Sequence, residues 1–543
     1  MSNISVDFDG TLRSYDGEPI VKIIKLVKED IANGDNVVVI TRRPKDETHN
    51  GLNGLGVIQW VKDNVGDIPV FFTNGIPKYK MLLRKNIDIH YDDDQYEIRL
   101  VKENTKVQVI EVNYDKSSKR ESAMEYHKLT RENKIYHDKV ACIIDHGLFV
   151  SMANKLGESF GNTFYFSPWQ SSFPTSNDTL VGTGFSNFKR LNDLFDYIDD
   201  IDIFIFTDIY HSDLQCYLKS LGKRVWGTFG GDSMEIYRWD FIQTLKSLGL
   251  NTPPTVLIVG ISKLKEYLQS VENKFIKVDS IYRGDIESFH HINYDISKPL
   301  LDKIEYKTGP NGECIRFIVQ DGIDAIVETG YDGWVIDGMF PDECLVGIEE
   351  KDKGYIGEVR KYSDINKQVR EINDALIPLF KEYGYRGMFS TEVRITSDGK
   401  AYLIDPTTRN PSPPTSTMLE LIENISEIIW EGSNGLMVQP KFSNRFGGEI
   451  IGTSDFAREN FMQIHCEESG GIYAPNSCII DNKLYVVPPK YEDMNICCNI
   501  ACGGSSIEDV VKNLEDKCYN IHGIGLTLDV SVLDKAIEGM SNI

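Results

Sequence analysis

The stretch that decides the fold of most of this chain is Gly387-Met-Phe-Ser-Thr-Glu392-Val-Arg394-Ile-Thr-Ser-Asp-Gly-Lys-Ala-Tyr-Leu-Ile-Asp405-Pro-Thr407-Thr-Arg409-Asn-Pro. Residues 389–395 and 401–404 are mixed or apolar runs, and a Ser-Asp-Gly sequence separates them. Such a polar, glycine-containing separator is typical of a hairpin turn. The stretch therefore predicts two antiparallel β-strands.

Two carboxylates mark this hairpin, Glu392 in its first strand and Asp405 at the end of its second. Antiparallel strands can bring such residues side by side, where they offer the oxygen ligands that Mg²⁺ prefers. Arg409 follows within reach of the same place and is suited to a phosphate or a carboxylate. The alternative is a surface hairpin with ordinary solvated charges, which the pattern alone leaves open.

The hairpin resembles the metal-binding end of the ATP-grasp fold, whose strand pair closes on a motif of the type Glu-x-Asn-Pro-Arg. Here that motif reads Asp405-Pro-Thr407-Thr-Arg409. Asp405 keeps the charge on a shorter arm, and Thr407 replaces an amide oxygen with a hydroxyl. The resemblance implies that Glu392, Asp405 and Thr407 bind Mg²⁺, with Mn²⁺ as an alternative, and that Arg409 stabilises a transferred phosphoryl group.

Length, composition and net charge limit the classes of protein and partner that fit this chain. A chain of 543 residues exceeds one ordinary core and implies several domains, and 41% hydrophobic and 10% aromatic residues are globular values. The formal net charge of −24 repels nucleic acid and anionic membranes. We therefore expect small-molecule partners, namely a carboxylate, an amine and a phosphorylated metabolite, and no membrane; the charge argues against nucleic acid.

Cysteine usage and the absence of apolar runs bear on location. The ten cysteines are scattered without Cys-x-x-Cys pairs, which favours structural thiols in a reducing cytosol. Neither a signal-like segment nor a run of membrane-spanning length is visible. We expect a soluble, cytoplasmic protein, and the Lys, Ile and Asn usage fits an AT-rich genome, including that of a virus in its host's cytoplasm.

The chain opens with a short β-run that ends in Asp7-Phe-Asp9-Gly-Thr. Two carboxylates at this spacing suit phosphoryl transfer, because one can attack phosphorus and the other can protonate the leaving oxygen and then activate water. A second apolar strand ends at Thr41, and a third ends in Asp92-Asp93-Asp94 after Lys78 and Lys80. The carboxyl ends of parallel strands converge on one crevice. An ordinary Asp-Gly turn is the alternative.

These residues resemble the four motifs of the haloacid dehalogenase-like (HAD) phosphatases. The resemblance implies that Asp7 is the nucleophile and Asp9 the acid/base. It implies that Thr41 and one of the two lysines, Lys80 by preference, hold the phosphoryl group, while Asp92 or Asp93 joins Asp7 at Mg²⁺. The segments between the motifs are too short for a large cap domain, so we expect an open site.

A cation that leads a helix, Arg238, and one on a predicted strand, Lys277, precede the hairpin along the chain. Such cations can neutralise nucleotide phosphates, and the Arg283-Gly284 turn that follows can cover them. In ATP-grasp enzymes, cations and a glycine loop occur in this order before the metal hairpin. The resemblance therefore implies an ATP site that includes Arg238, Lys277, Arg283 and Gly284.

Residues 325–328 resemble the hinge whose backbone groups carry adenine, here at Val327. Glu328, or Asp332 or Asp337 after it, is implied as the acceptor from the ribose hydroxyls. In the order of its elements, the region from residue 138 to about 540 looks most like the phosphoribosylamine–glycine ligases (glycinamide ribonucleotide synthetases) of the ATP-grasp family.

The predicted architecture is a multidomain α/β protein. We expect a small, capless, HAD-like Rossmannoid domain (1–113), a linker (114–137), an α/β domain before the grasp (138–232), the α+β ATP-grasp subdomains (233–435) and a C-terminal substrate-side domain (436–543).

The predicted function is that of a bifunctional enzyme. It joins a carboxylate to an amine through an acyl phosphate, with ATP as co-substrate, and hydrolyses a phosphomonoester of a nucleotide or sugar-phosphate metabolite. The alternatives are a protein with only one active module, the other being a nucleotide-binding regulator or scaffold, and a nucleic-acid end-processing phosphatase.

Overall fold

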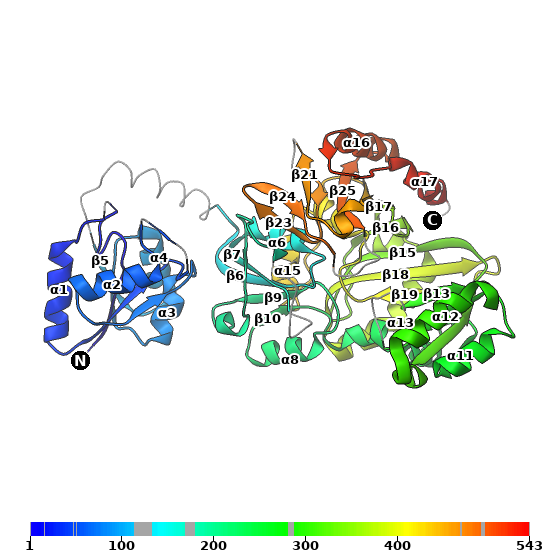
Figure 1. Cartoon of the computed structure of the whole chain (residues 1–543), viewed down its shortest axis with the longest axis horizontal. Helices are drawn as coiled ribbons and strands as arrows, with labels where there is room; N and C mark the ends of the chain where they lie inside the picture. The colour runs from blue at the N-terminus through cyan, green and yellow to red at the C-terminus, as the bar shows by residue number, and fades with distance from the viewer. Residues whose placement is uncertain are drawn as a thin grey trace. The chain divides into compact units, whose positions relative to one another are not determined.

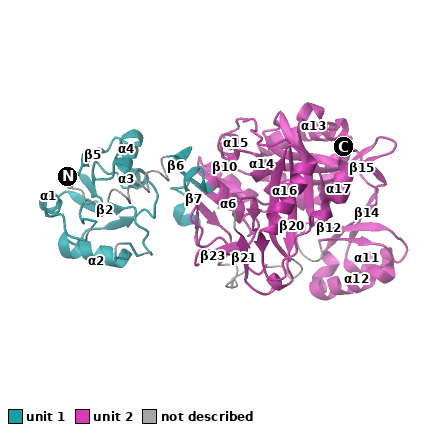
Figure 2. Cartoon of the chain, turned by 90° about the horizontal axis from the view of Figure 1, so that it is seen from above, with its two compact units in different colours: residues 1–141, 157–163, 194–202 teal, residues 142–156, 164–193, 203–543 magenta. Residues whose placement is uncertain are grey.

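The structure is a computed structural model that describes residues 2–15, 17–46, 48–49, 51–112, 133–168, 180–280, 287–466, 470–489 and 495–541. The chain divides into two compact units (Figures 1 and 2). The first comprises residues 1–141, 157–163 and 194–202, and the second comprises 142–156, 164–193 and 203–543. Most of the predicted linker, residues 113–132, lies outside the described residues.

The first unit contains a parallel five-stranded sheet with the order β3-β2-β1-β4-β5. Its strands are β1 (Asn3–Val6), β2 (Asn36–Thr41), β3 (Val70–Phe72), β4 (Ile89–Asp92) and β5 (Gln108–Glu111). The chain starts in the middle strand, builds one side of the sheet and then crosses to the other. This is doubly wound topology, in which β1 and β4 flank the point where the strand order reverses.

Helices cover both faces of this sheet, because the strand side chains that point to either face are mostly apolar. Helices α1 (Val21–Ala32) and α2 (Gly54–Asn64) pack on one face, against a core that includes Val6 and Val39. Helices α3 (Lys78–Arg84) and α4 (Gln95–Asn104) pack on the other, against Val38 and Ile40. Burial on both faces fits the near-continuous apolar runs of these strands.

A second five-stranded sheet, β10-β9-β6-β7-β8, has the same winding order. Its strands are β6 (Tyr136–Ile144), β7 (Phe160–Phe166), β8 (Lys189–Arg190), β9 (Ile203–Phe206) and β10 (Arg224–Trp226). The associated helices are α6 (Val150–Gly157) and α8 (Ser212–Ser220). The fresh α/β pattern predicted for this region is therefore present.

The second unit continues with a four-stranded antiparallel sheet, β11-β14-β12-β13, preceded by helices α9 (Ser233–Ile236) and α10 (Arg238–Ser247). Its strands are β11 (Thr255–Val259), β12 (Lys274–Val278), β13 (Ser288–His291) and β14 (Arg316–Asp321). Helices α11 (Ile261–Leu268) and α12 (Tyr294–Thr308) bury one face around Ile276 and Phe317. The opposite face carries Lys277.

The largest sheet has eight strands in the order β19-β18-β15-β16-β17-β20-β25-β22. They are β15 (Ala325–Ile336), β16 (Glu343–Glu350), β17 (Gly354–Lys361), β18 (Arg386–Thr396), β19 (Ala401–Thr407), β20 (Phe446–Thr453), β22 (Ile472–Tyr473) and β25 (Ile496–Gly504). Strands β18 and β19 form the predicted hairpin.

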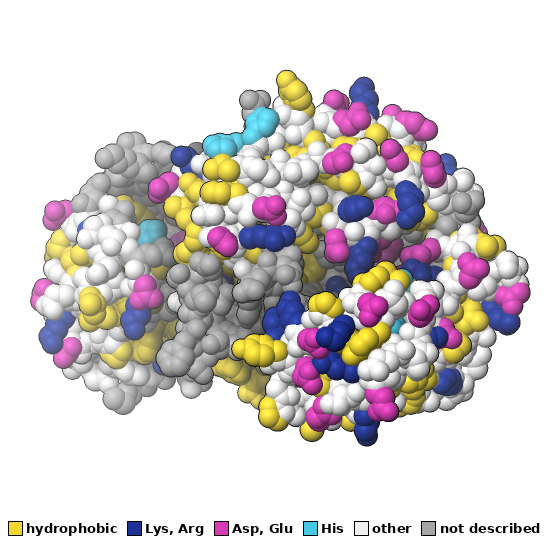
Figure 3. All heavy atoms as spheres, turned by 45° about the vertical axis from the view of Figure 1, so that its right-hand side comes forward, with side chains coloured by type: hydrophobic (Ala, Val, Ile, Leu, Met, Phe, Trp, Pro, Cys, Tyr) yellow, Lys and Arg dark blue, Asp and Glu magenta, His cyan; other side chains and the backbone are white. Residues whose placement is uncertain are grey.

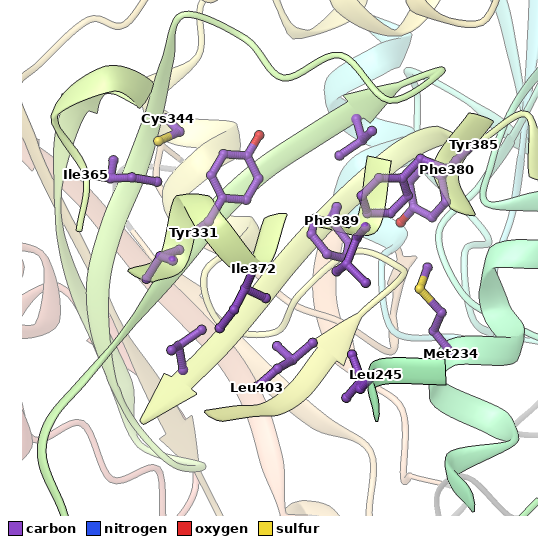
Figure 4. Close-up of a cluster of buried hydrophobic side chains, with 14 of the residues drawn as sticks. Met234, Leu245, Tyr331, Cys344, Ile365, Ile372, Phe380, Tyr385, Phe389 and Leu403 are labelled. Atoms are coloured by element: carbon purple, nitrogen blue, oxygen red, sulfur yellow. The ribbon is translucent and has the colours of Figure 1, made fainter. Parts of the chain in front are cut away.

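Helix α13 (Lys367–Tyr383) packs on one face of β15, β18 and β19. The core between them is rich in aromatic residues, and Tyr331, Phe380, Tyr385 and Phe389 gather there (Figure 4). Because side chains alternate across a strand, the neighbours of Tyr331 and Phe389 along their strands point to the opposite face. Those neighbours include Asp332 and Ser390.

The C-terminal part of the second unit adds a four-stranded sheet, β23-β24-β21-β26, and four helices. These elements are β21 (Met462–Cys466), β23 (Ser477–Ile480), β24 (Lys483–Val486), β26 (Ile521–His522), α14 (Thr415–Leu421), α15 (Ile425–Gly432), α16 (Ile507–Tyr519) and α17 (Asp534–Met540). Strands β21 and β24 and helices α16 and α17 contribute to a core that includes Ile450 and Leu514.

The structure confirms a multidomain α/β protein, while the finer domain boundaries remain predictions. On the face shown in Figure 3, acidic and basic side chains are interspersed. Within the described ranges, none of the helices combines the length and the apolar character needed to cross a membrane.

Candidate functional site

The hairpin carboxylates lie side by side, since Glu392 of β18 pairs with Asp405 of β19. The next pair is Val393 with Leu403, so Ile404 is an extra residue in β19. Such a β-bulge re-aims the side chain beside it. Without it, alternation would put Asp405 on the same face as Leu403, which is buried in the core under α13. The bulge instead places Asp405 on the face of Glu392.

Partial burial and neighbouring charge disfavour the ionised form of Glu392. Burial, with Asp405 and Glu328 adding to it, raises the pKa of Glu392 to about 7. Asp405 faces Glu392 across the hairpin, and a divalent cation bound between the two carboxylates would relieve their repulsion.

A cavity beside the pair contains both predicted phosphate-binding cations. Its lining consists of Met234, Arg238, Phe241, Ile242, Leu245, Thr252, Pro253, Lys277, Ile318, Gln320, Leu403, Ile404, Asp405 and Pro406. Lys277 reaches across it, and its Nζ lies 3.4 Å from the Ile404 carbonyl oxygen. Arg238 donates to the Val278 carbonyl at 2.9 Å and pairs with Glu287 at 2.7 Å. The lining thus combines an apolar wall with two cations and a carboxylate, and the cations are suited to an anionic group.

Arg409 is held at the end of the hairpin by a buried carboxylate that the sequence did not reveal. Its Nε lies 3.3 Å from Oε2 of Glu235, a residue of the short helix α9. Glu235 also accepts the backbone N–H and the hydroxyl of Thr408. Burial raises the pKa of Glu235, Arg409 opposes that rise, and Asp405 adds to it. Arg409 is therefore positioned beside the carboxylate pair rather than in solvent.

The structure also places three other residues that were predicted to bind ATP or metal, namely Thr407, Val327 and Glu328. Thr407 pairs with Ser390, two positions from Glu392 and on its face. Val327 and Glu328 lie at the start of β15, where Glu328 pairs with Arg394 at 3.2 Å. The roles of Thr407, Val327 and Glu328 remain predictions.

The assignment of Asp337 to the ribose is corrected. Glu392 pairs with Gly330, and Asp337 follows seven residues later, which on an extended strand is roughly 23 Å away. Arg386 also binds both oxygens of Asp337, at 2.7 and 3.0 Å. Asp337 therefore belongs to a structural ion pair. Arg283 and Gly284 lie outside the described residues.

A second cluster lies in the first unit, at the carboxyl ends of β1 and β4. One oxygen each of Asp7, Asp92 and Asp93 lies within 4.8 Å of the others, and all three residues are buried. Lys78 Nζ lies 2.8 Å from both Asp7 and Asp92. Gly10, at φ +75°, closes the turn, and a Cβ there would lie 2.3 Å from the Asp93 carboxylate.

The charges in this cluster do not balance, because one ammonium group faces three carboxylates. Burial raises the pKa of Asp7, and Asp92 and Asp93 add to the rise despite Lys78. Burial also opposes ionisation of Asp92, but Lys78 and His90 outweigh it and lower its pKa. Three carboxylates beside one ammonium leave two negative charges, which is the complement of a divalent cation. The residues present therefore fit Mg²⁺.

The preference for Lys80 is corrected. Lys78 stands in the cluster, whereas Lys80 Nζ lies 2.7 Å from Asp202 within the first unit. Asp9 does not join the carboxylate cluster, because Arg43 binds both its oxygens at 2.6 and 2.7 Å. Thr41 is buried at the end of β2 and accepts the backbone N–H of Arg43 at 3.3 Å. Arg43 lies two residues after Thr41 and is not among the residues that the motifs predict.

No family model and no curated protein sequence matches this chain. Solved structures do. Phosphoribosylamine–glycine ligase from Thermotoga maritima is 14% identical, with a TM-score of 0.55 over 72% of this chain and 98% of that one. The biotin carboxylase domain of Hydrogenobacter thermophilus 2-oxoglutarate carboxylase, solved with MgADP, ADP and bicarbonate, is 11% identical, with a TM-score of 0.54 over 74% and 95%.

Biotin carboxylase from Campylobacter jejuni is 11% identical, with a TM-score of 0.50 over 71% of this chain and 92% of that one. At such identities the likeness shows the fold alone. About 72% of the chain has an ATP-grasp fold.

Proposed function

We propose that the larger part of this chain is an ATP- and Mg²⁺-dependent carboxylate–amine ligase. The observation that carries the proposal is the bulge in β19, which sets Asp405 opposite Glu392 at the rim of the cavity that contains Lys277. Bulges are common in edge strands such as β19, but this one lies where it puts two carboxylates side by side next to a cavity that contains two cations. The structural neighbours with ligase and carboxylase names support the same reading.

The reaction has two steps. The γ-phosphoryl group of ATP passes to a substrate carboxylate, which becomes an acyl phosphate, and an amine then attacks the acyl carbon and displaces phosphate. Glu392 and Asp405 would hold Mg²⁺, which would neutralise charge on the phosphate oxygens. Lys277 and Arg238 offset the remaining phosphate charge, and Arg409 stabilises the group in transfer. Likeness to phosphoribosylamine–glycine ligase favours a nucleotide-like or sugar-phosphate substrate.

A second candidate function belongs to the first unit. The cluster of Asp7, Asp92, Asp93 and Lys78 at the reversal point of a doubly wound sheet supports a HAD-type phosphomonoesterase. Asp7 attacks phosphorus, and Lys78 neutralises the phosphoryl oxygens. Asp9 serves as acid/base once its pairing with Arg43 gives way to the substrate.

The experiment that tests both functions measures ADP and phosphate release with Mg-ATP and pooled carboxylates and amines. Wild type is compared with Asp405→Asn and Asp7→Asn, with Asp398→Asn in the exposed hairpin turn as the matched control. ADP release lost in Asp405→Asn alone establishes the ligase. If no pool yields ADP, the ligase proposal is wrong, and Mg-ATP binding without turnover then indicates a nucleotide-binding regulator.

A further inference from the structure

Two polar side chains interrupt the apolar strands at the centre of the first unit's sheet. Ser5 of β1 and His90 of β4 pair across the two strands, and both side chains are fully buried. Ser5 also pairs with Val38 of β2, which packs under helices α3 and α4, so the polar pair lies on that face. Burying polar groups costs free energy unless they are hydrogen-bonded. The partners of this pair therefore decide what it does.

Ser5, His90 and Asp92 form one chain of hydrogen bonds that ends at the carboxylate cluster. Ser5 Oγ lies 2.8 Å from His90 Nδ1, and His90 Nε2 lies 2.9 Å from Asp92 Oδ2. Asp92 also accepts from the Lys78 ammonium at 2.8 Å. Because an ionised carboxylate has no hydrogen to donate, Nε2 of His90 carries the hydrogen, and Nδ1 accepts the Ser5 hydroxyl. Every polar atom of the imidazole is thus used in holding Asp92.

A serine, a histidine and an aspartate in this order also make up nucleophilic triads. In such a triad the serine hydroxyl meets the substrate, whereas the Ser5 hydroxyl is fully buried beneath the helices. The chain therefore acts on Asp92 and not through Ser5.

The three donors around Asp92 leave one acceptor position open. Oδ2 accepts Lys78 Nζ and His90 Nε2, and Oδ1 accepts the backbone N–H of Asp94 at 2.9 Å. Each carboxylate oxygen offers about two lone pairs. Oδ2 is therefore filled, and only Oδ1 has a lone pair left for a cation. Asp92 is prepared to ligate with a single oxygen.

Ligation through one oxygen distinguishes between the two common divalent cations of this chemistry. Mg²⁺ is small and demands near-ideal octahedral coordination, which one-oxygen carboxylate ligands satisfy. Ca²⁺ is larger, takes more oxygen ligands and often binds both oxygens of one carboxylate. A carboxylate whose second oxygen is occupied by fixed donors therefore favours Mg²⁺.

We propose that His90 is a positioning residue that gives the cluster of Asp7, Asp92 and Asp93 a preference for Mg²⁺ over Ca²⁺. The His90 N–H group fills the second lone pair of Asp92 Oδ2, and Ser5 fixes the orientation of the ring. Partners of metal-ligating carboxylates commonly control affinity in this way. The inference deepens the second proposed function, because it concerns the cation of the same site, but its readout is cation binding and not hydrolysis.

The test uses two amide variants that differ in reach. In His90→Asn the amide nitrogen stands near the position of Nδ1 and does not reach Asp92, whereas in His90→Gln it stands near the position of Nε2 and does. Ser5→Ala cuts the chain at its other end and leaves the contact with Asp92 in place. All variants are made in the full-length protein with Asp405→Asn, which disables the proposed cation site of the hairpin.

Bound Mn²⁺ is the probe, and free Mn²⁺ is measured by its paramagnetic resonance signal. Mg²⁺ and Ca²⁺ are added as competitors, so that the affinity for each follows from the Mn²⁺ that it displaces. Binding that Asp7→Asn abolishes is assigned to the cluster.

We expect His90→Asn to lower the Mg²⁺ affinity by about 10- to 100-fold, the usual effect of losing an outer partner of a metal ligand. The Ca²⁺ affinity should fall much less, because Oδ2 becomes available to the larger ion. His90→Gln and Ser5→Ala should keep the wild-type preference. Equal losses for both ions in His90→Asn, or the same change of preference in Ser5→Ala, overturn the inference and leave His90 a structural residue.

Thermal unfolding shows whether each variant folds. If His90→Asn does not fold, His90→Met takes its place, since it fills the volume of the ring without an N–H group. A wild type that prefers Mg²⁺ as expected but hydrolyses no phosphomonoester contradicts the phosphatase and leaves the inference standing. Mn²⁺ binding that is unchanged in Asp7→Asn overturns the inference.

Discussion

Asp405 faces Glu392 across two antiparallel strands only because Ile404 is an extra residue in β19. Strict alternation would place Leu403 and Asp405 on the same face of the sheet, but the bulge places them on opposite faces. Leu403 fills the core under α13, while Asp405, two residues later, leaves that face, pairs with Glu392 and lines the cavity. Bulges of this kind recur next to active sites because they turn one side chain without moving the sheet.

Loss of either carboxylate is expected to abolish tight binding of Mg-ADP. Each of Glu392→Gln and Asp405→Asn should weaken binding by at least about 100-fold, because loss of a mere outer-shell partner already costs about 10- to 100-fold. Isothermal titration with Mg-ADP measures the effect, and Asp398→Asn in the turn of the same hairpin is the control. Unchanged affinity in both variants would mean that the pair is not the cation site.

Binding of Mg-ADP should release protons at acidic pH. Burial, Asp405 and Glu328 raise the pKa of Glu392 to about 7, so this carboxyl is protonated at pH 6 and must lose its proton to ligate a cation. Titrations at pH 6 in two buffers of different ionisation enthalpy should reveal about one proton released, and close to none at pH 8.5. Affinity should rise over the same interval.

Glu392→Gln provides the control for this linkage, because its amide has no proton to release. A wild type whose binding enthalpy is the same in both buffers at pH 6 would contradict the assignment.

Lys277 should contribute to nucleotide affinity, and its strand neighbour Lys274 should not. Lys277 reaches into the cavity beside Asp405, whereas Lys274 pairs with Asp321 at the far end of the strand. Lys277→Met is expected to weaken Mg-ATP binding by at least tenfold, or about 1.4 kcal/mol. Lys274→Met should bind like wild type in the same titration, and equal losses would point to a general effect of charge.

In the first unit, Lys78 rather than Lys80 should support phosphomonoester hydrolysis. Lys78 is buried between Asp7 and Asp92, so its removal leaves three carboxylates without an ammonium. Hydrolysis of p-nitrophenyl phosphate with Mg²⁺ should fall by at least about 100-fold in Lys78→Met, as expected when the charge stabilisation of a transition state is lost. Lys80→Met should retain activity. Loss of activity in Lys80→Met but not in Lys78→Met would assign the phosphoryl contact to Lys80. Thermal unfolding of both variants shows whether a loss of activity comes from a loss of stability.

The presence of Lys78 instead of Lys80 in the cluster depends on a detail of helix geometry that the sequence did not reveal. Motif order predicted a lysine before the third strand, but neither the helix that carries it nor where that helix begins. Helix α3 starts at Lys78, and two residues of helix turn a side chain by about 200°, so Lys80 points away from the cluster. The carboxylates at the ends of β1 and β4, and those that face each other in the β18–β19 hairpin, were predictable because strand ends and hairpins bring residues together without such phase information.

Features that depend on three-dimensional register escaped prediction. The bulge at Ile404 leaves no mark in the residue types, and the length of β15 decides that Asp337 lies far from Glu392 although both residues are acidic and close to the motif. The buried partner Glu235 lies 174 residues before Arg409 in the chain, and no local pattern connects them. Long-range pairing of this sort follows from packing alone.

The stability of the second unit should carry a pH signature from Glu449 on β20. This residue is fully buried and accepts hydrogen bonds from Thr417 and Asn499. Burial raises its pKa from an ordinary 4.5 to about 7. Between these values the folded state holds the proton more tightly than the unfolded state, so the free energy of unfolding falls as pH rises through this window.

The Glu449→Gln variant has no such dependence, since its amide does not ionise. The difference in free energy of unfolding should therefore shift in favour of the variant by up to about 3 kcal/mol between pH 4.5 and 8. Urea denaturation at both pH values measures it, with Glu423→Gln at an exposed position as the control. Parallel pH profiles for Glu449→Gln and wild type would show that Glu449 ionises in the fold as easily as in the unfolded chain.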